Sequence, residues 1–265
     1  MVRLNKKNYF SPSNQNLTNS RIGDWLKCKR FFFELHIAGN RTKETTDSML
    51  FGKAVDMWLT EGKEKFLKNF IGVERRNKNN THGLIELNNT VYEQIVALCS
   101  KVELTDAYKS LKGHKRQVLL KQDLDLGRFK GIAGILDFLK VDKKNNRAII
   151  TDLKTTTDIS PTKYFFTCKT YRYFSQLGVY GLLVQNKYGI KDIEYRHLAI
   201  QKDPDGIYSC QTFIFDKDLI EYEIAKTFDI LKDISAEKDF LPNNASWDKA
   251  VVISGRKEEK EEVEI

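Results

Sequence analysis

The chain has 265 residues, of which 41% are hydrophobic and 30% are charged, a balance that is ordinary for a soluble globular protein. Its net charge of +8 favours a polyanionic partner such as nucleic acid, although basic surfaces also serve solubility. The sequence lacks an apolar run of membrane-spanning length and the apolar core of a signal peptide, and its four cysteines are scattered, which argues against zinc and iron–sulfur sites.

The first segment, residues 1–17, is polar and rich in Asn and Ser, so we expect a flexible arm. Thr18 is a plausible N-cap for a helix that runs to about His36. The charge pattern favours a packing helix with a solvated basic face. The alternative is that Arg21 and Arg30 contact phosphate groups.

A second helix is predicted from about Asp47 into the region 66–70. Gly52 lies in its interior, where glycine costs up to about 1 kcal/mol against alanine, so a close approach of backbone or ligand is expected there. Asp56 follows four residues later on the same helix face. A polar, basic loop over 72–83 and a helix over 88–110 come next.

The centre of the sequence predicts a hairpin that follows a first strand over 117–126. One arm ends its apolar run at Asp137, the loop is Lys143-Lys-Asn-Asn146, and the other arm returns through Asp152 to Lys154. If the loop is centred between Lys144 and Asn145, Asp137 faces Asp152 directly. A loop slipped by one residue would offset the two acids.

Two carboxylates that face each other among apolar neighbours repel, and a divalent cation between them would remove that conflict. Hard oxygen donors with room for water suit Mg²⁺ or Mn²⁺ better than zinc. Lys154 emerges on the same strand face as Asp152. Taken alone, the Asp-X-Lys triplet favours a simple ion pair between these two residues.

After the hairpin, Pro161 and its cap Ser160 predict a helix, followed by a strongly periodic segment over 169–185. The side chains that form one stripe on this segment are Lys169, Tyr173, Gln176 and Tyr180. Stripes of this kind more often pack in the hydrophobic core. Because this one includes Lys and Gln and follows the acids directly, contact with the substrate is an equally reasonable interpretation.

The last elements are two strands over 193–201 and 207–215, joined by the turn Asp203-Pro-Asp-Gly206, and a helix over 216–239. We therefore expect a flexible arm (1–17), one domain (18–242) with a helical part (18–112) and a core of sheet and helices (113–242), and a charged tail (243–265).

This order of elements, with acids on the second and third strands of the core, resembles the PD-(D/E)XK nuclease superfamily. Within it the likeness is to RecB-type domains, including phage exonucleases, the mitochondrial genome maintenance exonuclease and CRISPR-associated RecB-like nucleases. The segment from Thr18 to Phe31 is similar to the family's Ser-X-X-Arg helix, and Phe51 to Asp56 to its Gly-X-X-X-His motif. The glycine-then-Asp motif matches Gly131 to Asp137, the (D/E)XK motif Asp152 to Lys154, and the Gln-X-X-X-Tyr helix Gln176 to Tyr180.

The sequence departs from the family's pattern at two points. Asp56 replaces the motif histidine, which still allows metal ligation and favours a hard cation. The iron–sulfur relatives carry clustered cysteines near the C-terminus, whereas Cys28 has no such partners, so we expect no iron–sulfur cluster.

The resemblance implies an α/β, restriction-endonuclease-like core, in which a central mixed sheet is flanked by helices, with an N-terminal helical elaboration. It implies Mg²⁺-dependent hydrolysis of DNA, most simply by an exonuclease of phage or bacterial recombination, repair or replication that acts in the cytoplasm, with proteins of those processes as candidate partners. Asp137, Asp152, Asp56 and the Leu153 carbonyl would hold the metal, Lys154 would orient or deprotonate the attacking water, and Gln176 and Tyr180 would position DNA. The alternatives are an inactive DNA-binding module of the same fold and a structure-specific or RNA endonuclease.

Overall fold

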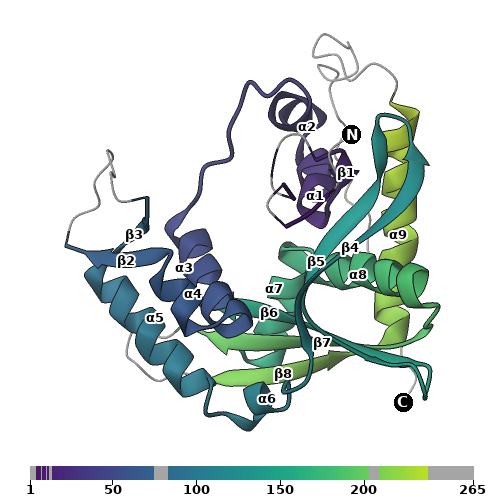
Figure 1. Ribbon diagram of the computed structural model, residues 1–265. Helices are drawn as coiled ribbons and strands as arrows, with labels where there is room; N and C mark the ends of the chain where they lie inside the picture. Colours follow the sequence, from purple (N-terminus) through teal and green to yellow (C-terminus); the bar gives the residue numbers. More distant parts are fainter. Residues whose placement is uncertain are drawn as a thin grey trace.

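The structure is a computed structural model that describes residues 4–6, 8–9, 11, 14–74, 83–202 and 209–237. The first elements are β1 (Asn16–Leu17), α1 (Asn19–Lys27), α2 (Lys29–His36), α3 (Asp47–Asp56), the π-helical turn η1 (Met57–Glu61), α4 (Lys63–Leu67), β2 (Phe70–Val73), β3 (Ile85–Asn88), α5 (Asn89–Val102) and α6 (Asp106–Lys109). The later ones are β4 (Lys115–Leu126), β5 (Phe129–Asp142), β6 (Arg147–Thr156), α7 (Pro161–Thr170), α8 (Tyr173–Tyr188), β7 (Asp192–Gln201), β8 (Cys210–Phe215) and α9 (Lys217–Ala236). The predicted α/β fold, a central mixed sheet flanked by helices, is confirmed (Figure 1).

The main sheet is organised around β5, which pairs along one edge with antiparallel β4. On its other edge β5 pairs with parallel β1 at residues 131–132 and with antiparallel β6 at residues 138–142. The sheet then continues through parallel β7 and antiparallel β8. Among the described strands, none pairs with residues 133–137 on this second edge, and Asp137 lies at the end of that gap.

A glycine at the start of β5 is required by the close approach of β4. Gly131 has a φ of 143°, and a Cβ atom there would lie 2.0 Å from the carbonyl oxygen of Gln122. The same part of the ladder contains a register shift between Asp123 and Leu126. Only glycine therefore fits this position without moving the neighbouring backbone.

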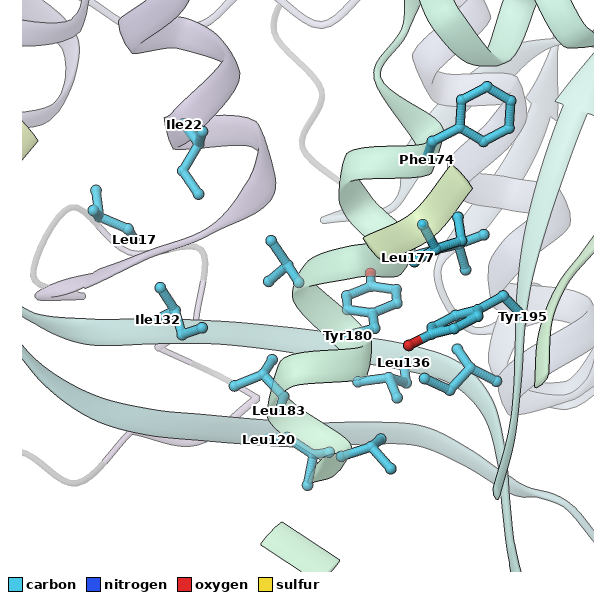
Figure 2. Packing of buried hydrophobic residues seen from close by; sticks show 14 of the residues in the cluster. Leu17, Ile22, Leu120, Ile132, Leu136, Phe174, Leu177, Tyr180, Leu183 and Tyr195 are labelled. Carbon is cyan, nitrogen blue, oxygen red and sulfur yellow. The ribbon is translucent and has the colours of Figure 1, made fainter. Parts of the chain in front are cut away.

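Two clusters of buried apolar residues hold the helices against the sheet. The first joins α1, α8 and α9 to the sheet, and Figure 2 shows Leu177 and Leu183 of α8 packed near Leu120 of β4 and Leu136 of β5. The second cluster joins α3, η1 and α5 to the sheet through residues such as Trp58. The group α3–α5 thus stands apart from α8 and α9 (Figure 1), and strand β6 of the β5–β6 hairpin contacts both groups.

The N-terminal segment differs from our expectation in two ways. Asn16 and Leu17, placed in the flexible arm, form a buried strand on β5. The helix expected from Thr18 to His36 is two helices, because Cys28 has extended backbone (φ −169°, ψ 119°) and caps the second helix with its side chain. The break turns α2 relative to α1, which neither hydrophobic spacing nor charge indicated.

The periodic segment over 169–185 is also divided between two helices. Arg172 adopts a left-handed conformation with a φ of 57° at the start of α8, so Lys169 belongs to α7 whereas Tyr173, Gln176 and Tyr180 belong to α8. The predicted four-residue stripe is therefore wrong at Lys169. The sequence shows a continuous period here because nothing in residue type marks a non-glycine residue with positive φ.

The remaining differences are local. The helix expected from Asp47 to residues 66–70 is divided into α3, η1 and α4, the helix expected over 88–110 into α5 and α6, and β2 and β3 form a small parallel sheet that we did not predict. Most of the expected loop over 72–83, the turn at 203–206 and the tail over 243–265 lie outside the described residues. No helix in the described ranges has both the length and the apolar character needed to cross a bilayer.

Candidate active site

The β5–β6 hairpin brings Asp137 and Asp152 together at the point where the two strands separate. The ladder pairs Phe138 with Thr151, which is the predicted register, and it ends there. One oxygen of Asp137 instead accepts a hydrogen bond of 2.8 Å from the backbone N–H of Leu153. The register is therefore confirmed over residues 138–142, while the two acids lie just beyond the last ladder pair rather than directly across it.

Asp56 joins these acids from a helix. It is the last residue of α3, and a single amide links it to the hairpin: Gln117 Nε2 donates to Asp56 at 3.3 and 3.4 Å and to Asp137 at 3.3 Å. The same nitrogen lies 2.9 Å from the hydroxyl of Thr60. Gln117 was missed in the sequence, where it reads only as the start of a strand. Its φ of 49° is the local distortion that accompanies this contact.

Burial and nearby carboxylates raise the pKa of Asp56 and of Asp137. Burial and the charge of Asp152 raise the pKa of Asp56 to about 7. Burial, followed by the charges of Asp56 and Asp152, raises the pKa of Asp137 well above its usual value, although the N–H of Leu153 works in the opposite direction. A bound cation would relieve both effects, so the donor chemistry of Asp56 and Asp137 fits a hard divalent ion.

The three acids do not converge into one complete ligand set. Within the described ranges, no group of three or more His, Cys, Asp or Glu side chains is arranged to hold a metal ion. The reason lies in Asp152, a fully buried side chain that is ion-paired with Lys154. Asp56 and Asp137 therefore face the same amide, while Asp152 is held by the neighbouring lysine.

Lys154 is the first member of a chain of polar contacts that runs to two residues of α8. Its ammonium donates to Gln176 Oε1 at 2.9 Å, and Gln176 Nε2 donates to the hydroxyl of Tyr180 at 2.7 Å. The same ammonium lies 4.6 Å from the ring centroid of Tyr173. Burial lowers the pKa of Lys154, but the charges of Asp152 and Asp137 outweigh it and leave the pKa raised. The lysine is therefore a fixed positive charge.

The place of Tyr180 depends on a glycine in the facing strand. A Cβ atom at Gly134 would lie 2.7 Å from the ring of Tyr180, so a side chain there would displace the ring. Figure 2 shows Tyr180 on α8 beside Leu136 of β5. The second glycine of the motif that ends at Asp137 thus makes room for the tyrosine of the Gln-X-X-X-Tyr pair.

A cavity of about 300 Å³ opens over Asp56, Gln117 and Asp137, and we call it the acid cavity. Gln176, Tyr180 and Tyr9 also line it. Tyr9 comes from the segment that we expected to be a flexible arm, and its hydroxyl donates to the carbonyl of Ala133 at 3.4 Å. It bonds β5 within residues 133–137, where no described strand pairs with the second edge of β5. No sequence signal indicated this residue.

Two of the predicted DNA-contacting residues lie elsewhere. Arg21 is buried, and its guanidinium donates to the backbone carbonyls of Asn14 and, at 3.0 Å, Asn16, so it holds β1 rather than a phosphate. Lys169 lies on α7, where its ammonium is 4.9 Å from the ring centroid of Phe165. It is not one of the residues that line the acid cavity. Arg30 is exposed on α2, and its contact with DNA stays a prediction.

The four cysteines are free and come from four different elements or caps. Cys28 caps α2, Cys99 is buried in α5, Cys168 in α7, and Cys210 begins β8.

The chain is similar to known proteins in family and in fold. Residues 19–240 match the family described as a PDDEXK-like domain of unknown function, DUF3799. No curated protein matches the sequence. Among solved structures, a candidate exonuclease from Eubacterium rectale is similar with a TM-score of 0.66 and 15% identity over 97% of both chains, a likeness of fold. An alkaline exonuclease from Laribacter hongkongensis has 14% identity over 86% of this chain and 94% of its own, and its TM-score of 0.33 supports no argument.

The family match covers most of the described chain and includes Asp56, Gln117 and the whole β5–β6 hairpin, whereas Tyr9 lies outside it. It agrees with the mixed sheet and with the Asp, Asp and Lys that β5 and β6 bring together. The chain belongs to the PDDEXK-like family DUF3799, a member of the PD-(D/E)XK superfamily by its fold and motif.

Proposed function

We propose that this protein is a metal-dependent deoxyribonuclease, of the exonuclease type, that hydrolyses DNA phosphodiester bonds. The observation that carries the proposal is the junction of Asp56, Gln117 and Asp137 in one cavity beside the Asp152–Lys154 ion pair. Clustered acids with raised pKa values next to a fixed lysine are unfavourable for stability alone, and such arrangements gather at catalytic sites.

Asp56 and Asp137 would hold Mg²⁺ or Mn²⁺, and the further candidate ligands are Asp152, which is ion-paired with Lys154, and the Leu153 carbonyl. The metal would supply an activated water and neutralise charge that develops on the phosphate. The protein's own contribution is positioning: Gln117 keeps Asp56 and Asp137 together, and the N–H of Leu153 fixes the Asp137 carboxylate.

Lys154 is suited to one of its two expected roles. Because the neighbouring acids raise its pKa, the ammonium keeps its proton and acts as a fixed donor toward the water or the phosphate oxygens, rather than as a base. Gln176 orients this ammonium, and Tyr180 orients Gln176. These two residues would position the DNA backbone or a base near the cut through the same chain of hydrogen bonds.

The direct test is digestion of one linear duplex, the same sequence as a single strand, and a closed circle, each with Mg²⁺. We expect the linear substrates to be degraded while the circle stays intact, and Asp152→Ala to be inactive on all of them. Cutting of the circle would indicate an endonuclease instead. DNA binding without cleavage under any divalent metal would favour an inactive binding module.

The biological setting that we propose is bacterial or phage recombination, repair or replication in the cytoplasm, with proteins of those processes as partners. Its support is the sequence resemblance to RecB-type exonucleases.

A further inference from the structure

A second cavity has a volume of about 610 Å³ and shares no described lining residue with the acid cavity. Lys154 and Lys202 line it together with Tyr171, Tyr173 and a run of threonines, Thr155-Thr-Thr157, and we call it the threonine cavity. Lys154 connects the two cavities, because its ammonium bonds Gln176 of the acid cavity.

The threonine cavity has the chemistry of an anion site. No carboxylate occurs among the described residues that line it, whereas hydroxyls come from Ser48 and several threonines. Lys202 donates to the hydroxyl of Ser48 at 2.8 Å, and no carboxylate of the described residues lies within ion-pairing distance of it. Burial lowers the pKa of Lys202, as expected for a partly desolvated cation. A phosphodiester would supply a negative charge and accept hydrogen bonds from the hydroxyls.

Aromatic rings extend this cavity from the catalytic lysine toward solvent. The ammonium of Lys154 lies 4.6 Å from the ring centroid of Tyr173, and the ring of Tyr173 stacks on that of Tyr171 with centroids 5.7 Å apart and planes at 24°. Tyr171 is 64% exposed at the end of this stack. Its outer face offers an unpaired base a surface to stack on, a face that a paired base within a duplex could not reach.

Building on the nuclease function above, we propose that the threonine cavity binds the unpaired nucleotide that adjoins the scissile phosphate. Lys202 and the threonine hydroxyls hold the phosphate of that nucleotide, and Tyr171 stacks on its base. The enzyme thus separates the strand at the site of cleavage and holds it as a single strand while the acid cavity acts on the neighbouring bond.

The test measures binding of a fluorescently labelled oligothymidine in EDTA, so that cleavage does not interfere. Tyr171→Ala should weaken binding by about tenfold, within the range found for loss of one base–aromatic stack, and Tyr171→Phe should bind as wild type. Lys202→Ala should reduce the slope of log affinity against log salt by about 0.7, the value for one phosphate contact on a single strand.

The matched control is Tyr222→Ala on α9, because Tyr222 is 62% exposed and also lies beside a lysine, Lys226, at 5.0 Å. This variant should bind as wild type. A second readout uses 2-aminopurine in place of one base: its fluorescence should be quenched by wild type and less by Tyr171→Ala, which a purely structural role of Tyr171 would not produce.

Equal binding by wild type, Tyr171→Ala and Lys202→Ala, or no binding by wild type, would overturn this inference. Cleavage of DNA by wild type in Mg²⁺ is measured in parallel. If wild type cleaves DNA and both variants bind the oligonucleotide as wild type does, only the proposed role of the threonine cavity is overturned. If the variants lose binding but wild type does not cleave DNA, the role of the cavity is supported and the nuclease function is contradicted.

Discussion

The acid cavity and the threonine cavity are connected through Lys154, yet they have opposite electrostatic character. The first holds Asp56 and Asp137 and no lysine or arginine among its described lining residues, whereas the second holds two lysines and no carboxylate. One is suited to a cation and the other to a phosphate. In the function that we propose, the metal and the strand are therefore bound in separate cavities, which Lys154 connects.

The largest effect should come from removing one acid of the acid cavity. Asp137→Asn keeps the size of the side chain but loses its charge, so we expect cleavage to fall by more than about 10³-fold, as several kcal/mol of metal-derived stabilisation are lost. Oligonucleotide affinity should change by less than about twofold, since the threonine cavity is untouched. The measurement is cleavage and binding on the same preparations.

Asp123→Asn, an exposed acid of β4 that is paired with Lys121, is the matched control and should cleave as wild type. Parallel loss of binding and cleavage in Asp137→Asn would show that the cavities do not act separately.

A smaller effect should follow from Gln117→Leu, because its amide holds Asp56 and Asp137 together. We expect Mn²⁺ affinity to fall by about 10- to 100-fold, as found when groups that orient metal ligands are removed. Titration calorimetry measures it, with Gln122→Leu on the same strand as the control. Unchanged Mn²⁺ affinity would mean that Gln117 does not organise the ligands.

The next effect is on stability. Gly134→Ala places a methyl group against the ring of Tyr180, since a Cβ there would lie 2.7 Å from it, and overpacking of this kind costs about 1–3 kcal/mol. Chemical denaturation should show the loss. The additional variant Tyr180→Leu removes the clash and should recover part of the lost stability. A double variant no more stable than Gly134→Ala would contradict this explanation.

The smallest effect is on how the stability of the metal-free protein depends on pH. Asp56 ionises at about 7 in the folded protein but near its ordinary value of 3.8 in an unfolded chain. Between these values the folded state keeps the proton, so its contribution to stability is present at low pH and is lost as pH rises to about 7.

Thermal unfolding from pH 4 to 8 should therefore show a decline in Tm up to about pH 7 that is weaker in Asp56→Asn, and Mg²⁺ should reduce the decline because it binds the ionised carboxylate. The same pH profile for both proteins would show that Asp56 does not titrate in this range.

The sequence predicted the hairpin, its register and the acids and lysine on it, because a polar loop between two β-branched arms determines which residues share a face. It also placed Asp56, Gln176 and Tyr180 near them, through resemblance to a family. Both signals depend on local spacing or on ordered motifs, which a single sequence carries.

What could not be predicted depends on contacts between distant segments. Gln117 and Tyr9 reach the acid cavity through the tertiary fold, and the left-handed Arg172 separates Lys169 from the rest of the stripe. From the sequence, Arg21 is expected to be a basic surface residue. In the structure it is buried and donates to a backbone carbonyl of β1. No periodicity or residue type records these partners.

The most direct test of the division between the two cavities is Mn²⁺ binding by calorimetry, with wild type compared with Asp137→Asn and Lys202→Ala. We predict that wild type and Lys202→Ala bind Mn²⁺ equally and that Asp137→Asn binds at least about tenfold more weakly. Equal affinity in wild type and Asp137→Asn, or no binding by wild type, would contradict the assignment of the metal to the acid cavity.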